Sequence, residues 1–76
     1  MTKLDELLKE AFRVKESDYT DESELMNFKE WDSMAHMFLI TKLEETYNIM
    51  LDGDEIAIMN TVGQIKNILR KHNVVE

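Results

Sequence analysis

The sequence predicts an all-α protein folded as an up-and-down four-helix bundle, with three main helices, one short helix and a long first loop. Apolar residues recur every three or four positions in several segments, whereas strand-like alternation is scarce. The chain also lacks proline and has only two glycines, so little in it interrupts a helix. Helices of this kind bury their apolar stripes against one another, which gives a bundle.

The first helix is predicted from Thr2 to Val14. We expect the Thr2 hydroxyl to cap its first turn, and Asp5 and Glu6 lie at the positive end of its dipole. Its apolar residues recur at helical spacing and form one stripe, made of Leu4, Leu7, Leu8, Ala11 and Phe12.

Residues 15–31 are predicted to form a long connection that is rich in acids and has no clear periodicity. Loops of this length are often functional or packed by their own side chains. We expect a short helical turn near Ser23–Met26. Four apolar side chains are expected to hold the loop against the helices, namely Leu25, Met26, Phe28 and Trp31.

The second helix is predicted to begin at Asp32 or Ser33 and to end near Tyr47, with Asp32 as a good N-cap. One arc of this helix is expected to face the core and contains Met37, Ile40, Leu43 and Tyr47. An adjacent arc carries two large apolar side chains without an obvious internal partner and contains Met34, Phe38 and Thr41.

The C-terminal third is predicted to contain a short helix and a last main helix. Residues 48–54 are expected to form a loop in which Asp-Gly-Asp supplies the turn, and residues 55–59 the short helix. Thr61 caps the last helix, Val62 to Lys71, and residues 73–76 are expected to fray. Its apolar stripe is Val62, Ile65, Ile68 and Leu69.

The charge distribution excludes some partners and favours others. Sixteen Asp and Glu outnumber nine Lys and Arg, giving a net charge of −7, and residues 16–55 alone carry −10. An acidic chain is a poor nucleic-acid binder, because phosphate contacts need Lys and Arg. We therefore expect a basic protein partner and no nucleic acid.

The length and composition limit the remaining classes. Seventy-six residues predict a single domain, 1–76, with a small core. The chain has no cysteine, and His36 and His72 lie far apart, so we expect no disulfide, cysteine nucleophile or metal site. No apolar run approaches the ~18 residues of a membrane span, and the charged N-terminal segment is unlike a signal peptide. These features predict a cytoplasmic monomer.

The string Glu30-Trp31-Asp32-Ser33-Met34 is the most informative part of the sequence. With Asp32 as the N-cap, Ser33 lies in the first helical turn, where another protein can reach its hydroxyl. The positive end of the helix dipole also favours a phosphate attached at that point. On spacing alone, the same residues also describe a capped helix start with a surplus serine.

The chain resembles acyl carrier proteins and the related peptidyl carriers along nearly its whole length. Asp32-Ser33-Met34 is similar to the family's Asp-Ser-Leu attachment motif, and Leu43-Glu44-Glu45-Thr46-Tyr47 to its Leu-Glu-Glu-x-Phe. Thr61-Val62-Gly63-Gln64-Ile65 leads the last helix, as in the family. Several matched positions in order are more specific than the tripeptide alone.

This resemblance implies that Ser33, next to the motif residue Asp32, carries a 4′-phosphopantetheine arm. A phosphopantetheinyl transferase would transfer the arm from coenzyme A with Mg²⁺, and the arm's thiol would hold acyl groups as thioesters. Such a carrier catalyses nothing itself and presents its cargo to fatty-acid, polyketide or related biosynthetic enzymes, such as a ligase, a ketosynthase or an acyltransferase. By the same resemblance, acyl chains lie between the second and third helices, against Ile40, Leu43, Ile56 and Met59.

Several residues depart from the pattern of many fatty-acid carriers. Glu30 and Trp31 replace a glycine and a small residue, Ala35 and Phe38 replace residues that are often acidic, and Met34 replaces leucine. The candidate partner-binding residues therefore mix apolar and acidic side chains, and they are Met34, Met37, Phe38, Thr41, Glu44 and Glu45. We expect a specialised carrier whose partner offers a hydrophobic groove rimmed by Lys or Arg.

Alternatives remain at this stage. Phe38 has a second interpretation, in which its ring folds back against the long loop on Trp31. An aminoacyl or peptidyl carrier, or a small acidic helical interaction domain without a prosthetic group, would also fit the sequence. Asp32, Ser33 and His36 have the residue types of a hydrolase triad, but a chain this short offers no evident substrate pocket, so we expect no catalytic residue.

The acidic turn at Asp52, Asp54 and Glu55 resembles a cation site. Its glycine, Gly53, is misplaced for an EF-hand loop. A solvated acidic turn is therefore predicted, without a metal. His72 is expected to act as a cation at the negative end of the last helix when it is protonated.

Overall fold

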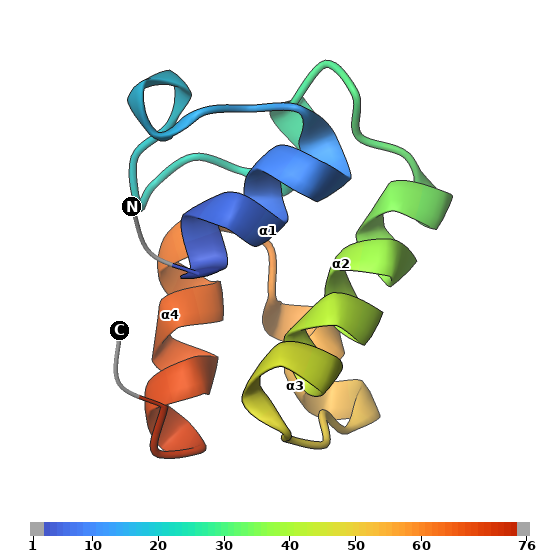
Figure 1. Ribbon diagram of the computed structural model, residues 1–76, viewed down its shortest axis with the longest axis vertical. Coiled ribbons are helices and arrows are strands. Elements are labelled where there is room, and N and C mark those ends of the chain that lie inside the picture. Colours follow the sequence, from blue (N-terminus) through green and yellow to red (C-terminus); the bar gives the residue numbers. More distant parts are fainter. Residues whose placement is uncertain (1–2, 75–76) are drawn as a thin grey trace.

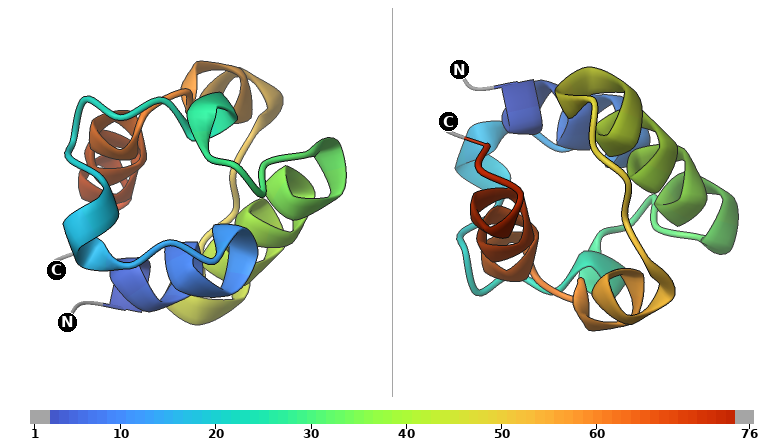
Figure 2. Two further views of the ribbon diagram at one scale, coloured as in Figure 1. Left: turned by 90° about the horizontal axis from the view of Figure 1, so that it is seen from above. Right: turned by 90° about the horizontal axis from the view of Figure 1, so that it is seen from below.

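The computed structural model describes residues 3–74, and this part of the protein is all-α, as predicted. Its four α-helices are α1 (Lys3–Phe12), α2 (Ser33–Tyr47), α3 (Gly53–Ile58) and α4 (Val62–Lys71) (Figure 1). Seen along the vertical axis of Figure 1, the helices surround a common core, with α1 beside α2 and the short α3 between α2 and α4 (Figure 2). Residues 3–74 contain no β-strand, and their one isolated bridge joins Glu24 to Thr61.

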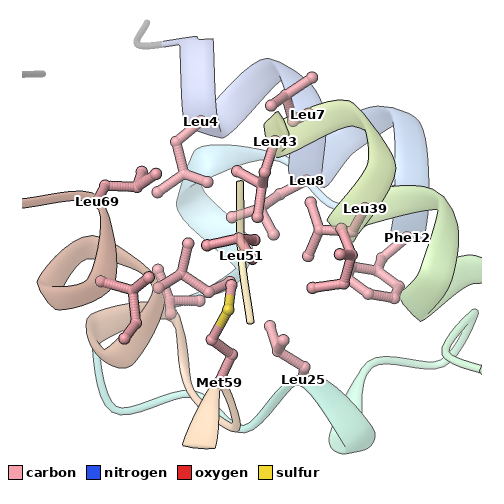
Figure 3. Close-up of a cluster of buried hydrophobic side chains, with 14 residues drawn as sticks. Leu4, Leu7, Leu8, Phe12, Leu25, Leu39, Leu43, Leu51, Met59 and Leu69 are labelled. Atoms are coloured by element: carbon pink, nitrogen blue, oxygen red, sulfur yellow. The ribbon is translucent and has the colours of Figure 1, made fainter. Parts of the chain in front are cut away.

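The core consists of apolar side chains from α1, α2 and α4, together with residues of the connections (Figure 3). The connections contribute Leu25, Leu51 and Met59, so the loops as well as the long helices are anchored by burial. Fully burying a leucine or isoleucine contributes about 1.5–3 kcal/mol. Side chains with no exposed surface include Leu8, Leu39, Leu43, Met59, Val62 and Ile65.

Helix α1 ends at Phe12, two residues earlier than predicted. Arg13 adopts the left-handed conformation with φ of 57°, and its N–H donates to the Lys9 carbonyl oxygen at 2.8 Å. A left-handed residue is a common way to end a helix, because it turns the chain out of the helical path. The predicted start at Thr2 lies outside the described residues.

The long loop contains two short 3₁₀ turns, η1 (Glu16–Asp18) and η2 (Leu25–Asn27). The turn expected near Ser23–Met26 is therefore present, although it starts two residues later, and η1 is an additional element. Backbone hydrogen bonds hold this loop to the start of α4. The Leu25 N–H donates to the Asn60 carbonyl oxygen at 2.9 Å, and the Gly63 N–H donates to that of Asp21 at 2.8 Å.

Three of the four side chains expected to anchor the loop do so. Leu25 is buried, Phe28 packs against Phe12 with ring centroids 5.5 Å apart, and Trp31 is half-buried against the core. The prediction for Met26 is wrong, because this side chain is exposed. Leu25 and Met26 are neighbours in one 3₁₀ turn, and only one of two such neighbours can point inward.

Helix α2 has the predicted bounds, and three of the four residues expected on its core face, Ile40, Leu43 and Tyr47, do pack there. Its N-cap is Asp32, as expected, and its C-cap is Asn48 in the left-handed conformation. The buried residues are Leu39, Ile40 and Leu43, whereas Met37 is 54% exposed, so its predicted place in the core is wrong. Apolar residues surround much of α2, and the packing of α1 against it decides which of them are buried.

Helix α3 begins at Gly53, two residues before the predicted start, because Asp52 is its N-cap. The Asp52 carboxylate accepts the Glu55 N–H at 2.8 Å, and the Glu55 carboxylate accepts the Asp52 N–H at 3.1 Å. This reciprocal capping box satisfies two backbone donors that the helix leaves free. The expected Asp-Gly-Asp turn is therefore the first turn of the helix. Helix α4 has the predicted bounds, with Thr61 as its N-cap.

Candidate functional site

The candidate site lies where the long loop enters α2. The Asp32 carboxylate accepts the Ala35 N–H at 2.7 Å, which fixes the first turn of the helix. Ser33 is the first residue of α2 and is exposed. Its hydroxyl is therefore accessible to another protein and lies at the positive end of the dipole of a 15-residue helix.

Ser33 borders a shallow, mainly apolar groove of about 300 Å³. The walls come from three separate parts of the chain, namely the long loop, the start of α2 and the end of α3. The backbone bonds between the loop and the α3–α4 connection hold two of these walls together. The lining residues are Leu25, Met26, Trp31, Ser33, His36, Met37, Ile56, Met59 and Asn60.

Trp31 and His36 make a paired wall of this groove. The Trp31 indole N–H donates to Nδ1 of His36 at 3.4 Å, and the two rings meet edge to face with centroids 6.2 Å apart. Burial lowers the pKa of His36, because desolvation disfavours the charged imidazolium. Nδ1 can accept a hydrogen bond only when it carries no proton. The hydrogen bond from Trp31 and the burial therefore both favour a neutral His36.

Two of the four residues that the family resemblance assigns to the acyl cleft line this groove, and the other two do not. Ile56 and Met59 line the groove beside Ser33. Ile40 and Leu43 do not line it, and both are buried in the core. The groove wall that sequence analysis missed consists of Trp31, His36 and residues of η2, which lie close in space although the sequence gives no periodic signal for them.

The candidate partner-binding residues of α2 fall into two groups. Met34, Met37, Phe38, Thr41 and Glu45 are exposed, so they are accessible to a partner. Glu44 is half-buried, and its carboxylate accepts the Leu51 N–H at 2.9 Å. Glu44 therefore also anchors the connection that follows α2.

One interpretation of the sequence placed the Phe38 ring against the long loop on Trp31, and this interpretation is wrong. The ring is 41% exposed, and the Lys42 ammonium lies 5.9 Å from the ring centroid. This distance is within the range of a cation–π contact.

The triad interpretation of Asp32, Ser33 and His36 has no geometric support. The Asp32 carboxylate is hydrogen-bonded to the backbone of α2, and His36 is oriented by the Trp31 indole. A catalytic triad instead needs a carboxylate or similar acceptor that holds the imidazole.

The acidic turn at Asp52–Glu55 is held by internal contacts. Glu55 is buried, and besides its place in the capping box its Oε2 lies 2.8 Å from Nε2 of His72 and 3.3 Å from Nζ of Lys71. Within residues 3–74 no three His, Cys, Asp or Glu side chains are placed to hold a metal ion. His72 is the C-cap of α4, at the helix end where the sequence places it, and its contact with Glu55 also joins that end of the helix to α3.

A second hollow, of about 450 Å³, lies between α1, the long loop and α4. Charged residues line much of it, including Asp5, Glu16 and Arg70, and Lys66 forms an ion pair with Asp21 across 2.7 Å. It is larger than the groove beside Ser33 but does not include that serine. The two hollows therefore differ in chemistry, since the groove is mainly apolar.

The fold and the site define a small helical domain with an exposed serine at a helix N-terminus beside an apolar groove. No protein-family model matches the chain, and no curated protein shows significant similarity to it. Among residues 3–74, none of the helices has the length and apolar character needed to span a membrane.

Proposed function

We propose that this protein is an acyl carrier protein whose Ser33 bears a 4′-phosphopantetheine arm, and that its helices form the up-and-down bundle of that family. One observation carries the proposal. Ser33 is exposed in the first turn of α2, immediately after the Asp32 cap, and it borders an apolar groove. The same arrangement supplies an attachment point, an anion-favouring environment and an apolar surface for cargo.

The residues present fit the proposed group. A phosphate ester on Ser33 lies at the N-terminus of α2, where the helix dipole and the first-turn N–H groups favour negative charge. When bound, the arm supplies a thiol that carries an acyl group as a thioester. Met37 and Ile56 offer apolar surface beside the attachment point, and burying each methylene there contributes about 0.8 kcal/mol at most.

Loading requires a partner enzyme. In the transfer from coenzyme A, a bond forms between the Ser33 oxygen and the phosphorus of the arm, and the bond from that phosphorus to the nucleotide part of coenzyme A breaks. The serine proton passes to a base, which the transferase supplies. The chain itself acts as a monomeric cytoplasmic carrier, and its tether raises the effective concentration of cargo at a ligase, ketosynthase or acyltransferase.

Mass spectrometry of the intact protein tests this proposal. After incubation with coenzyme A, Mg²⁺ and a broad-specificity phosphopantetheinyl transferase, the wild type should gain the mass of one arm, and Ser33→Ala should gain none. Ser17→Ala is the matched control, because Ser17 is an exposed serine in η1 away from the groove, and this variant should be loaded normally.

Modification at another serine, or no modification of folded wild type by several transferases, would contradict the carrier proposal and favour an acidic interaction domain. If the arm is attached, the identity of the activating enzyme that loads its thiol separates an acyl carrier from an aminoacyl or peptidyl carrier.

A further inference from the structure

The His36 imidazole lines the groove beside Ser33 and has one ring nitrogen left for a ligand. Its Nδ1 accepts the Trp31 indole N–H at 3.4 Å. Because Nδ1 must be bare to accept, the one proton of the neutral ring is on Nε2. Among residues 3–74 nothing forms a hydrogen bond or an ion pair with that Nε2. The ring therefore offers one N–H donor.

Trp31 holds that donor in place. The two rings meet edge to face with centroids 6.2 Å apart, so the imidazole is fixed by a packing contact as well as by the hydrogen bond. Trp31 itself is half-buried against the core, and its backbone N–H donates to the Phe28 carbonyl oxygen at 3.0 Å. An anchored residue of the long loop thus orients the imidazole, and a donor held in this way needs little reordering when a ligand binds.

Ser33 and His36 lie on the same face of α2. They are three positions apart, a spacing that makes side chains neighbours on a helix. A helical side chain also leans toward the N-terminus, so the imidazole covers the turn that contains Ser33. Both residues line the groove, which agrees with this placement. A group attached to the Ser33 oxygen therefore starts beside the His36 ring.

The surroundings of the donor indicate which acceptor fits. An N–H donor pairs with an oxygen, and the hydrogen bond is strongest when that oxygen is anionic. Besides His36, the residues that line the groove carry no ionised side chain, so nothing there competes for the donor or repels an anion. Of the acids next to the pair in the sequence, Asp32 accepts the Ala35 N–H and Glu30 is exposed. The anion attached directly to Ser33 would be the phosphodiester of the arm, whereas a cargo carbonyl is at the far end of the arm.

We infer that His36 binds the phosphodiester of the arm on Ser33 through an Nε2–H donor that Trp31 holds in position. This inference rests on the proposed function, because it concerns the protein with its arm attached. His36 is then a binding residue for the arm, and Trp31 is a positioning residue that acts through it. Holding the phosphate at the groove keeps the start of the arm beside the apolar walls.

Attachment of the arm should change the proton affinity of His36. Burial lowers the pKa of His36 in the protein without the arm. A phosphodiester is negatively charged, and a negative charge beside the ring raises the pKa, because it favours the imidazolium. Protonation places a proton on Nδ1, which ends the hydrogen bond from Trp31. The loaded protein should therefore lose the Trp31–His36 bond at a higher pH than the unloaded protein.

Nuclear magnetic resonance of the full chain, before and after loading with coenzyme A and a phosphopantetheinyl transferase, tests this inference. The ring protons of His36 should titrate at a higher pH in the loaded protein. The phosphorus signal of the arm should shift through the same pH range, although a phosphodiester has no proton of its own to lose there. The single indole N–H signal, which comes from Trp31, should move with both.

Three substitutions separate the hydrogen bond from the titration. His36→Gln keeps one acceptor and one donor but does not titrate, so its phosphorus signal should lie near the wild-type position at neutral pH and stay there as the pH falls. His36→Phe keeps a ring without a donor, so its signal should be displaced at neutral pH. Trp31→Phe removes the indole N–H, and its signal should shift toward that of His36→Phe, because nothing then orients the imidazole.

His72→Gln is the matched control. His72 is the other histidine of the chain, is paired with Glu55 and does not line the groove, so this variant should keep the wild-type phosphorus titration. Circular dichroism checks that each variant keeps its helicity. If His36→Phe unfolds, the wild-type titration and His36→Gln still test the inference.

Two outcomes would overturn the role of His36 while leaving the carrier proposal intact. One is a His36 that titrates at the same pH with and without the arm. The other is a phosphorus signal that does not follow the titration of His36, or that still shifts with pH in His36→Gln. Failure of the carrier proposal looks different, because folded wild type would gain no arm at Ser33 and would show no phosphorus signal, and both proposals would then fall.

Discussion

Helices α2 and α4 use their apolar residues differently. In α4 all four apolar residues, Val62, Ile65, Ile68 and Leu69, are at least 95% buried. In α2 three apolar residues are buried, and Met34, Met37 and Phe38 remain exposed. The demands of the core therefore explain the apolar sequence of α4 completely and that of α2 only in part. The apolar residues that the core does not explain lie in the N-terminal half of α2, which begins with Ser33. We expect binding, not folding, to select the residues there.

The largest expected effect is a loss of stability when a buried residue of α4 is truncated, which the same kind of change on the exposed face of α2 should not cause. Ile65→Ala removes a fully buried side chain from α4 and should lower the free energy of unfolding by about 2–5 kcal/mol. Such a loss is a large part of the total stability of a small domain. Urea denaturation followed by circular dichroism measures it.

Met37→Ala on α2 is the matched comparison and should change the same free energy by less than about 0.5 kcal/mol, because its side chain is exposed. Comparable losses in the two variants would show that Met37 packs in the core in solution. The contrast between the helices would then disappear.

A smaller effect concerns the end of α4, which Glu55 joins to α3. The Asp52 backbone N–H, and then His72 and Lys71, lower the pKa of Glu55, although burial opposes this. A lowered pKa means that the carboxylate stabilises the fold above the ordinary glutamate range, and that this contribution is lost as the pH falls through the lowered pKa. Stability should therefore decline on acidification, and Glu55→Gln should make that decline shallower.

Urea denaturation at a series of acidic pH values measures this dependence. Glu45→Gln is the control, because Glu45 is exposed on α2, and it should preserve the wild-type decline. If Glu55→Gln and the wild type lose stability in parallel, the ionised Glu55 does not secure the end of α4.

The smallest effect compares the two glycines at helix starts. A Cβ at Gly53 meets no atom within 4 Å, and its φ is not positive, so Gly53→Ala should stabilise the fold by about 0.4–1 kcal/mol. A Cβ at Gly63 lies 3.0 Å from the Asp21 carbonyl oxygen, which accepts the Gly63 N–H. Gly63→Ala should therefore lower the melting temperature by pushing the long loop away from α4.

Thermal unfolding of the two variants measures this difference. Equal gains in melting temperature for both alanines would mean that the loop moves aside at no cost, and that α4 is less firmly tied to it than the hydrogen bonds suggest.

Features that depend on a few neighbouring residues could be predicted from the sequence. The start of α2 follows from the chemistry of Asp32, and the bounds of α4 follow from Thr61 and a clear apolar stripe. The exposed position of Ser33 follows from the same local rule, since a residue just after an N-cap lies at the end of the helix.

Features that depend on contacts between distant segments could not be predicted. The periodicity of α2 placed Met37 in the core, because apolar residues on several sides leave the buried face undetermined until α1 packs against it. The groove wall formed by Trp31 and His36 also needs the long loop in its final position, and backbone bonds to Asn60 and Gly63, far along the chain, set that position.

Trp31 is the only tryptophan in the chain, and its indole lines the groove beside Ser33 in contact with the His36 imidazole. The protein thus contains a fluorophore at the place where a modification, a cargo or a docking partner would arrive. Filling the groove should shift the indole emission to shorter wavelength by removing water, and protonating His36 should change its intensity. Titrations at this site can therefore be followed on the unlabelled protein.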